Sequence, residues 1–356
     1  MTFTEEIVTK RIAVIGAGSW GTALAISLAS SGHDVSLWAR RPAAAAFMDQ
    51  ERHNPTYLPK ALIPSSILIT SDLEAAVIRR DLWVFATPAQ SIREVARRVR
   101  PYAHPNLLVV SVAKGIENGT LKRTTEVLAE ELDGVPAEQI GVLYGPSHAE
   151  EVVAGCPTAV VAAAQDLAVA ESIQEVFMTP RLRVYVNTDL VGVEIAGSVK
   201  NVMAIAAGMS DGVGYGDNAK AALITRGNAE IQRLGMALGA SYKTFSGLAG
   251  IGDLVVTCMS RHSRNRFLGE AIGRGKTLEE VQREMTMVAE GVSTTRSVYD
   301  LSRRLQIEMP ITEAVYAILF EGMKPQEAVD ELMARAAKQE DWLPDCLQEG
   351  PKRSPS

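Results

Sequence analysis

A glycine-rich loop near the start of the chain constrains the fold most strongly. The segment Arg11–Gly16 (RIAVIG) is a short apolar, β-branched run, and residues 16–21 (GAGSWG) complete a GxGxxG motif before the helix-like segment Thr22–Ser31. In this context the first glycine permits a tight turn, the second lets the backbone approach a pyrophosphate, and the third lets the helix pack on the strand. The loop therefore predicts a dinucleotide site in which Gly16, Gly18 and Gly21 hold a pyrophosphate at a helix N-terminus.

Strand and helix signals alternate through the first half of the chain. Most of the strand-like segments are continuous apolar runs, which are typical of strands buried on both faces of a sheet. Helix-like segments such as Ser91–Val99 and Leu121–Leu132 separate several of them. This alternation predicts an α/β fold with a doubly wound, mainly parallel sheet. Besides the first run, strands are expected at residues 34–39 (DVSLWA), 82–88 (LWVFATP), 107–113 (LLVVSVA), 140–145 (IGVLYG), 158–163 (TAVVAA) and 183–186 (RVYV).

The pattern changes near residue 190, where strand signals largely stop and long helical segments follow. This change predicts a dinucleotide-binding domain over residues 1–190 and an all-helical domain over residues 191–340. The tail at residues 341–356 contains proline, lysine and serine and ends KRSPS, so we expect it to be disordered. The expected helices of the second half cover residues 190–209, 219–238, 266–273, 278–284, 293–305, 312–320 and 326–336.

The overall composition excludes several classes of partner. A net charge of −6 argues against a nucleic-acid or anionic-membrane partner held by bulk charge. Cys156, Cys258 and Cys346 are odd in number and lack CxxC spacing, and the histidines are scattered, so neither disulfides nor a metal site are expected. The N-terminus is polar, and the apolar stretch at residues 191–209 contains glutamate, lysine and asparagine, which a membrane span would not easily carry. We therefore expect a cytoplasmic protein without stable membrane insertion.

The end of the second expected strand bears on the choice of dinucleotide. An NAD-preferring fold usually places Asp or Glu there, where the carboxylate binds the ribose 2′-hydroxyl. This chain instead has Arg40 and Arg41. Two guanidinium groups suit a 2′-phosphate, which favours NADPH over NADH as the cofactor. The alternative is that both arginines belong to a solvated loop, where arginine is common.

A lysine stands in the middle of a nearly all-apolar helical segment, LVGVEIAGSVKNVMAIAAGM. The neighbours of this Lys200 three and four residues away are alanine, glycine and methionine, so no local carboxylate can pair with it. Burial of an ammonium group lowers its pKa, which suits a general acid–base near neutral pH. The adjacent Asn201 could supply a hydrogen bond to a substrate hydroxyl. The alternative, a lysine that snorkels to the surface, is disfavoured by the mid-helix position.

Two further charged residues follow an apolar or a glycine-rich segment. Lys114 ends an expected strand, and ligands of open α/β sheets bind outside the carboxyl ends of strands. A lysine there can neutralise a phosphate or stabilise a developing alkoxide, although a solvated loop lysine is an equal alternative. Asp253 lies after Gly250 and Gly252, where it either caps a helix or orients Lys200 or a substrate hydroxyl.

A basic turn, Ser263-Arg264-Asn265-Arg266, opens an expected helix. Free backbone N–H groups and a guanidinium fork make a good monophosphate site, and a basic surface turn is the alternative. The overall negative charge does not oppose a phosphate site, because one local cluster suffices for a single phosphate.

A series of longer motifs occurs in a fixed order along the chain. They are IGAGSWGTALA (15–25), AKG (113–115), GPSHAEEV (145–152), GSVKNVMAIAAGMSDG (197–212), ALITRG (222–227), GIGDLVVTC (250–258), SRNR (263–266) and VAEGV (288–292). Together they resemble the bacterial-type NAD(P)-dependent glycerol-3-phosphate dehydrogenase family, from about residue 10 to 335. The resemblance implies a Rossmann domain followed by an all-α substrate domain like the C-terminal domain of 6-phosphogluconate dehydrogenase.

The resemblance also implies which residues form the site, with Lys200 as proton donor and acceptor. Residues implied to contact the dinucleotide are Ser19, Trp20, Arg40, Ala149, Val288 and Glu290, and Lys114 and Arg264 are expected at both cofactor and substrate. Residues implied to bind the substrate are Lys114, Gly145, Ser147, Lys200, Asp253, Ser263, Arg264 and Asn265. His148 stands where the family often has an aromatic residue, and we assign no catalytic role to it.

The sequence therefore predicts an oxidoreductase that interconverts dihydroxyacetone phosphate and sn-glycerol 3-phosphate by hydride transfer with NADPH or NADH. The family further implies a homodimer that supplies glycerol 3-phosphate for phospholipid synthesis. One alternative is a 3-hydroxyacid or ketopantoate-type reductase, which shares the fold but needs a carboxylate site. The other is a nucleotide sensor without turnover, which the set of Lys200, Asp253 and Arg264 disfavours.

Overall fold

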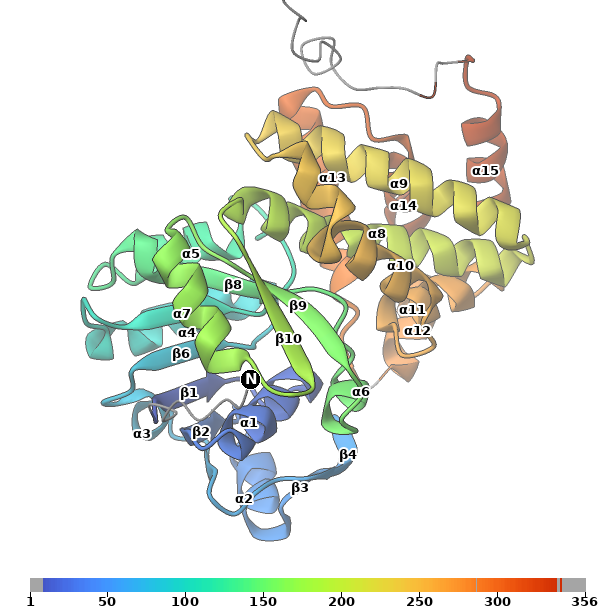
Figure 1. Cartoon of the computed structure of the whole chain (residues 1–356). Coiled ribbons are helices and arrows are strands. Elements are labelled where there is room, and N and C mark those ends of the chain that lie inside the picture. The colour runs from blue at the N-terminus through green and yellow to red at the C-terminus, as the bar shows by residue number, and fades with distance from the viewer. Residues whose placement is uncertain (1–8, 286, 338–339, 341–356) are drawn as a thin grey trace, which may run out of the picture.

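One large sheet organises the N-terminal half of the chain (Figure 1). The computed structural model describes residues 9–285, 287–337 and 340. In order across the sheet, the strands are β10 (Leu182–Asn187), β9 (Thr158–Ala163), β8 (Ile140–Tyr144), β7 (Leu108–Ser111), β6 (Leu82–Phe85), β1 (Arg11–Ile15), β2 (Asp34–Trp38) and β5 (Leu68–Thr70). All neighbours pair in parallel except β8 and β9, so the expected mainly parallel sheet is confirmed. A separate antiparallel pair contains β3 (His53–Asn54) and β4 (Leu58–Leu62).

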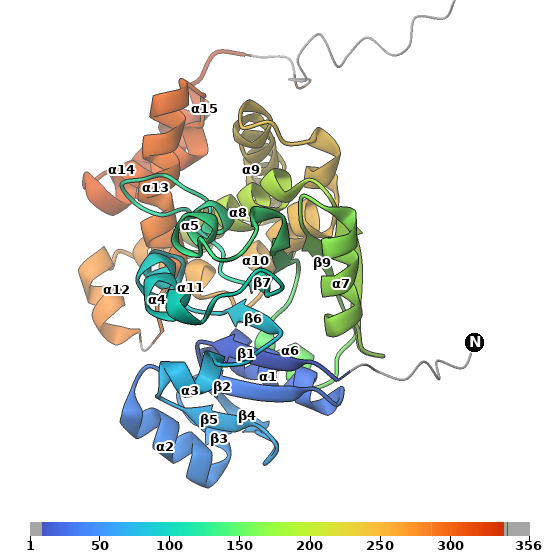
Figure 2. The same cartoon turned by 90° about the vertical axis from the view of Figure 1, so that its left-hand side faces the viewer.

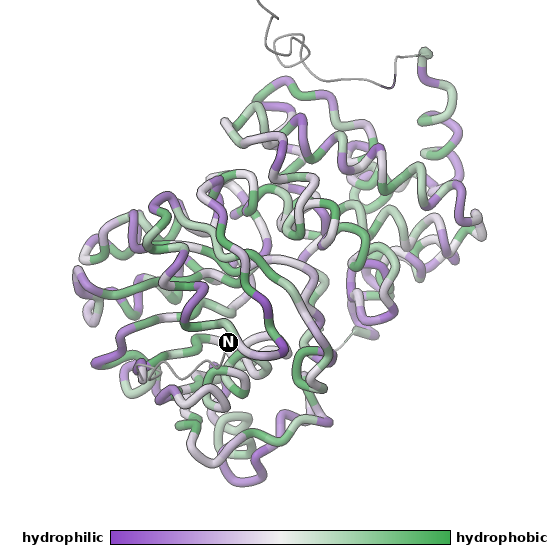
Figure 3. The backbone as a smooth tube through the Cα atoms, in the orientation of Figure 1, coloured by the Kyte–Doolittle hydropathy of each residue, from purple (hydrophilic) through white to green (hydrophobic). Residues whose placement is uncertain are grey.

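Helices cover both faces of this sheet (Figure 2). They are α1 (Ser19–Ser30), α2 (Pro42–Glu51), α3 (Leu73–Val77), α4 (Ile92–Val99), α5 (Thr124–Glu131), α6 (Ala149–Val153) and α7 (Leu167–Phe177). In β1, Ile12 and Val14 face a core completed by α1 and α7, whereas Ala13 and Ile15 face the core of α3, α4 and α5. All four side chains are fully buried, which explains the continuous apolar composition of the strand. In Figure 3 the green of hydrophobic residues predominates along the central strands.

The C-terminal half is helical and packs around α8 (Leu190–Val213), the core helix of this half. This helix is long and apolar enough to cross a membrane, but 94% of its apolar window is buried inside the protein. The expected change from sheet to helices is confirmed, because every strand of the described residues ends by Asn187. The remaining helices are α9 (Asp217–Ala237), α10 (Asp253–Met259), α11 (Arg264–Gly273), α12 (Leu278–Glu284), α13 (Glu290–Leu305), α14 (Pro310–Phe320) and α15 (Pro325–Met333).

The backbones of α8 and α11 approach each other closely where they cross. A Cβ atom at Gly208 would meet the carbonyl of Arg266, and a Cβ atom at Gly269 would meet the carbonyl of Ile205. Backbone atoms cannot move aside as a flexible side chain can, so only glycine fits at this crossing. The close approach holds the start of α11, which carries the basic turn, beside the middle of α8.

Several short elements were not predicted from the sequence. The segment from residue 42 to 77 forms α2, α3 and β3 to β5, although no strand was expected there. These strands are only two to five residues long, and β4 exposes three of its five residues, so it lacks the apolar run that marks the central strands. The helices α6 and α7 were not predicted either, and α10 was expected only in the alternative in which Asp253 caps a helix. The expected disordered tail at residues 341–356 lies outside the described residues.

Candidate active site

The glycine loop joins β1 to α1 with a geometry that only glycine allows. Gly16 has a φ of +125°, and a Cβ atom there would lie 2.7 Å from the carbonyl carbon of Ala86. A Cβ atom at Gly21 would collide with the carbonyl oxygen of Gly16. At Gly18, the N-cap of α1, a Cβ atom would meet nothing within 4 Å. The first and third glycines are thus required by the fold itself, whereas the second exposes backbone at the helix N-terminus to an approaching ligand.

Residues expected around the dinucleotide surround this loop. Ser19 and Trp20 begin α1, and the Trp20 indole Nε1 is buried without a hydrogen-bond partner in the described part of the chain. A buried donor without a partner is rare, and a polar ligand at the loop would satisfy it. Ala149 begins α6 and is buried in a small apolar cluster that Trp20 also contacts. Arg40 and Arg41 follow β2, are exposed, and form no ion pair with any described residue.

Two lysines share one buried carboxylate where the sheet meets the helical half. Lys200, on α8, donates to Asp253 Oδ1 at 2.5 Å and to Thr257 Oγ1 at 2.6 Å. Lys114, which follows β7, donates to Asp253 Oδ2 at 2.7 Å and to the carbonyl of Gly145 at 3.0 Å. The side chains of Asp253 and Lys200 are 1% and 7% exposed. The fold therefore gives Lys200 a carboxylate partner 53 positions away, although no carboxylate lies three or four residues from it on its own helix.

The environment of Lys200 favours loss of its proton. Burial lowers the pKa of Lys200 to about 8, and repulsion from the Lys114 ammonium acts in the same direction. The Asp253 carboxylate opposes both effects, because it stabilises the charged form of the lysine. A lysine with this pKa can both donate and accept a proton near neutral pH, which is the property of a general acid–base.

Amide side chains connect this cluster to α11 and α13. Asn201 Nδ2 donates to the Lys114 carbonyl at 3.4 Å, and Asn201 Oδ1 accepts from Asn265 Nδ2 at 3.0 Å. Asn265 Oδ1 in turn accepts from the backbone N–H of Gly291 at 2.9 Å. The amide of Asn201 is thus engaged by protein groups, and the chain of hydrogen bonds fixes Asn265 relative to the two lysines.

The basic turn and the start of α13 lie next to each other. Ser263 is the N-cap of α11 and accepts from the backbone N–H of Arg266 at 3.2 Å. Arg264 Nη1 donates to the carbonyl of Val288 at 3.2 Å. Glu290, the first residue of α13, accepts from the backbone N–H of Ala89 at 3.1 Å, and its burial raises its pKa. Ala89 follows β6, whose end contacts Gly16, so this carboxylate connects the helical half to the glycine-loop region.

The segment after β8 completes the site. Gly145 has a φ of +141°, and its carbonyl accepts from the Ser147 hydroxyl at 3.1 Å as well as from Lys114. His148 is the N-cap of α6, and its ring centroid lies 5.7 Å from that of His262, beside the basic turn. Burial lowers the pKa of His148. Its Nε2 has no hydrogen-bond partner among the described residues. His148, to which we assigned no catalytic role, thus lies beside the basic turn with an unpaired ring nitrogen.

The structure brings most of the expected substrate and nicotinamide-end residues into one connected cluster, and Arg40 and Arg41 lie apart from it at the end of β2. Sequence reasoning missed Thr257, which accepts from Lys200 and donates to the Asp253 carbonyl at 2.5 Å. A signal was available, because Thr257 follows Asp253 by four residues, about one helical turn, so both side chains lie on the same face if Asp253 begins a helix. Within the described ranges, no three His, Cys, Asp or Glu side chains form a group that could hold a metal.

Comparisons with known proteins identify the family. The model of the N-terminal part of NAD-dependent glycerol-3-phosphate dehydrogenase matches residues 11–170, and the model of its C-terminal part matches residues 189–330. A glycerol-3-phosphate dehydrogenase [NAD(P)+] from Salinibacter ruber is 63% identical over 337 residues, which cover 95% of this chain and 98% of that relative. Another from Pelodictyon phaeoclathratiforme is 58% identical over 329 residues, which cover 92% of this chain and 99% of that relative.

The fold agrees with these sequence matches. The crystal structure of a glycerol-3-phosphate dehydrogenase from Coxiella burnetii superposes with a TM-score of 0.88 at 41% identity, covering 92% of this chain and 99% of that one. The family suggested by the motifs is thereby confirmed. With matches to both parts of the family model and relatives aligned over nearly their full lengths, the chain belongs to the NAD-dependent glycerol-3-phosphate dehydrogenase family.

Proposed function

We propose that this protein interconverts dihydroxyacetone phosphate and sn-glycerol 3-phosphate by reversible hydride transfer with a nicotinamide dinucleotide. The observation that carries the proposal is the pair Lys200 and Lys114 on the single buried carboxylate of Asp253. This cluster lies beyond the carboxyl ends of the parallel strands, on the side where the glycine loop begins α1. A carbonyl reduction needs a proton donor and positive charge at the developing alkoxide, and these two ammonium groups provide both.

The residues around the glycine loop fit a dinucleotide. The backbone at Gly18 and the N-terminus of α1 would hold the pyrophosphate, and the unpartnered Trp20 indole N–H would gain an acceptor. When bound, the nicotinamide supplies the hydride to C2 of the substrate, or takes it up in the reverse direction. We further propose a preference for NADPH, because the exposed guanidinium groups of Arg40 and Arg41 suit a 2′-phosphate and β2 ends without a carboxylate.

The basic turn at the start of α11 would hold the substrate phosphate. Arg264 offers a guanidinium fork beside the helix N-terminus, and Asn265 is fixed by its hydrogen bonds to Asn201 and Gly291. Gly145 and Ser147 follow β8, and the Gly145 carbonyl accepts hydrogen bonds from Lys114 and from the Ser147 hydroxyl. Anchoring the phosphate at this turn would place the reacting carbonyl toward the lysines and pre-orient it for the reaction.

Lys200 would donate the proton to the C2 oxygen during reduction, and its neutral amine would accept that proton during oxidation. Lys114 remains close to the same oxygen and stabilises its negative charge as the hydride arrives. Asp253 holds both amines, and Thr257 gives Lys200 a second fixed partner, so the proton donor keeps one orientation.

The cellular context is also part of the proposal. We propose that the protein is cytoplasmic, acts as a homodimer and supplies glycerol 3-phosphate for glycerophospholipid synthesis, as the family resemblance implies. We further propose that residues 1–190 bind the dinucleotide and residues 191–340 the substrate, which is supported by the end of the sheet at Asn187 and the start of α8 at Leu190. Sedimentation at several protein concentrations tests the dimer, and a single monomeric species would contradict it.

The reaction is tested by following the oxidation of NADPH and of NADH with and without dihydroxyacetone phosphate. We expect fast oxidation that depends on this substrate, with NADPH used better than NADH, and no comparable rate with ketopantoate. Replacing Arg264 with alanine is expected to abolish most of the activity on the phosphorylated substrate. Oxidation with keto acids alone would support the reductase alternative, and tight NADPH binding without turnover would support a sensor; either result would refute the proposal.

A further inference from the structure

A buried glutamate near the start of α8 binds the start of a helix in the other half of the protein. Glu194 is 1% exposed and accepts four hydrogen bonds, all from residues at the start of α5. The Thr124 hydroxyl donates at 3.0 Å, the Thr125 N–H at 3.0 Å and the Thr125 hydroxyl at 2.6 Å, and the Arg123 guanidinium also donates. A buried carboxylate is costly unless it is fully paired, and this one is paired across the two halves.

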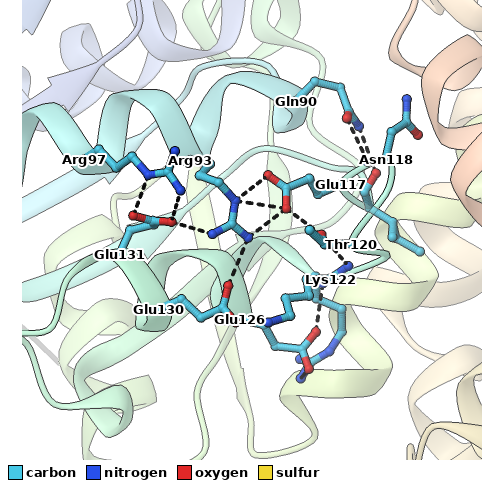
Figure 4. A network of polar contacts seen from close by, with 12 residues as sticks. Gln90, Arg93, Arg97, Glu117, Asn118, Thr120, Lys122, Glu126, Glu130 and Glu131 are labelled. Atoms are coloured by element: carbon cyan, nitrogen blue, oxygen red, sulfur yellow. Dashed lines mark hydrogen bonds and ion pairs between the residues drawn. The ribbon is translucent and has the colours of Figure 1, made fainter.

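The α5 helix is in turn tied to the loop that follows Lys114 (Figure 4). Arg93, on α4, donates to Glu117 in that loop at 2.8 Å and to Glu130 on α5 at 2.9 Å. The carboxylate of Glu131, also on α5, pairs with Arg93 as well. These contacts bind α4, α5 and the Lys114 loop into one unit. Because Glu194 binds α8 to the start of α5, these contacts also link α8 to the segment that carries Lys114.

A second contact beside Glu194 leads to the same lysine. The ring of Tyr144 packs against Gly197, which lies one turn after Glu194 on α8, and a Cβ atom there would collide with that ring. The Tyr144 hydroxyl donates to the carbonyl of Ala113, the residue before Lys114. The Lys114 ammonium lies 5.6 Å from the centre of the Tyr144 ring. The Thr124 hydroxyl, a partner of Glu194, lies 3.5 Å from the Tyr144 hydroxyl, so the first two turns of α8 contact the surroundings of Lys114 through two linked contacts.

We propose that Glu194 is a positioning residue that, by holding the start of α8 on α5, sets the place of Lys200 relative to Lys114 on their shared Asp253. Lys200 follows Glu194 by six residues, about 9 Å along a continuous helix. A rigid helix transmits a shift at its start to Lys200, and a misplacement of about 1 Å at reacting groups can cost a factor of about 100 in rate. The inference rests on the proposed role of Lys200 as proton donor.

The test compares Glu194→Gln with a control that breaks a similar contact elsewhere. In Glu194→Gln the amide NH₂ would face groups that also donate, so the contact with α5 loosens. Glu230, on α9, is an equally buried carboxylate, and it accepts from the N–H groups of Ile311 and Thr312 at the start of α14. Both partners of Glu230 lie in the helical half, so Glu230→Gln lowers stability without loosening α8 from α5.

We expect kcat of Glu194→Gln to fall about tenfold or more at saturating substrates, while KM for NADPH changes less than about twofold. The isotope effect with NADPH deuterated at the transferred position should increase, because hydride transfer becomes more rate-limiting. A smaller folded fraction cannot change an isotope effect, and Glu230→Gln should keep the wild-type value. If Glu194→Gln does not fold, Thr125→Val, which removes only the hydroxyl bond, should give the same changes on a smaller scale.

Wild-type kcat and isotope effect in the folded Glu194 or Thr125 variant would overturn the proposal, as would the same kinetic change in Glu230→Gln. Lys200→Met separates this failure from failure of the proposed function. An active Lys200→Met enzyme would refute the role of Lys200, whereas an inactive one together with a normal Glu194→Gln would refute only the positioning role.

Discussion

Replacing Asp253 with asparagine should shift the pH dependence of the reaction in a direction that the structure defines. The variant keeps the size of the side chain but removes the charge that both lysines approach within 2.5 and 2.7 Å. Burial and the Lys114 ammonium, which both lower the pKa of Lys200, then act without opposition. Loss of an opposite charge at this range lowers a lysine pKa by about 1–3 units, so the pKa of Lys200 should fall from about 8 to roughly 6.

The size of the effect follows from the fraction of Lys200 that carries its proton. Near about pH 7.5, a fall in pKa from about 8 to about 6 reduces the protonated fraction roughly 25-fold. The ammonium form is the proton donor in the reductive direction, so the rate of dihydroxyacetone phosphate reduction should fall by at least that factor. Activity should recover as the pH is lowered through about 6, where the wild-type enzyme gains almost nothing.

The assay is the rate of NADPH oxidation at saturating dihydroxyacetone phosphate, measured from about pH 5.5 to 9 for both enzymes. The oxidation of glycerol 3-phosphate, which needs the neutral amine, should change in the opposite sense and extend to lower pH in the variant. A variant profile with the wild-type shape, merely scaled down at every pH, would refute the claim that Asp253 sets the pKa of Lys200.

Three further predictions concern the cofactor loop and the helix packing. Gly18→Ala should keep the wild-type melting temperature but raise KM for NADPH at least tenfold, because a Cβ atom at residue 18 meets no protein atom. Gly21→Ala should unfold at a lower temperature, because a Cβ atom at residue 21 collides with the backbone, and equal melting temperatures of the two variants would contradict this. Arg40→Ser should raise KM for NADPH by roughly 10- to 100-fold and leave KM for NADH unchanged, since a hydrogen bond to a charged group contributes about 1.5–3 kcal/mol. Equal changes in the KM values for NADPH and NADH would exclude a contact between Arg40 and the 2′-phosphate. Gly269→Ala should lower the free energy of unfolding by about 1–3 kcal/mol in denaturant titrations, because its Cβ meets the Ile205 carbonyl; a neutral or stabilising effect would refute the close crossing.

The central sheet could be predicted because burial on both faces leaves a clear mark in the sequence. Strands such as β1 and β6 are continuous apolar runs, and their neighbours are helices of recognisable composition. The edge strand β5 has only three residues, and α2 is a run of alanines with little difference between its faces. Such short or uniform segments are decided by tertiary contacts, which local patterns do not record.

The site was predictable where a motif fixes the geometry and unpredictable where distant segments meet. The glycine loop was predictable because the GxGxxG motif between a strand and a helix defines the role of each glycine, although the atoms that crowd Gly16 belong to the distant residue Ala86. The pairing of Lys200 with Asp253 joins residues 53 positions apart, so the sequence around Lys200 indicated no partner. The sequence around Asp253 left its role open between a helix cap and a carboxylate that orients Lys200 or a substrate hydroxyl. Glu194 had appeared merely as a polar interruption in an apolar stretch, because its partners at the start of α5 lie about 70 positions earlier.

The most direct test of the account is to restore a proton donor to an enzyme that lacks the Lys200 side chain. Lys200→Ala should lose at least about 100-fold in the rate of dihydroxyacetone phosphate reduction, while its KM for NADPH stays near the wild-type value. Small primary amines added to this variant should restore activity in proportion to the concentration of their ammonium form, with rates that depend on the amine pKa. Near wild-type activity of Lys200→Ala without amines, or a loss that no amine can relieve, would contradict the assignment of Lys200 as the proton donor.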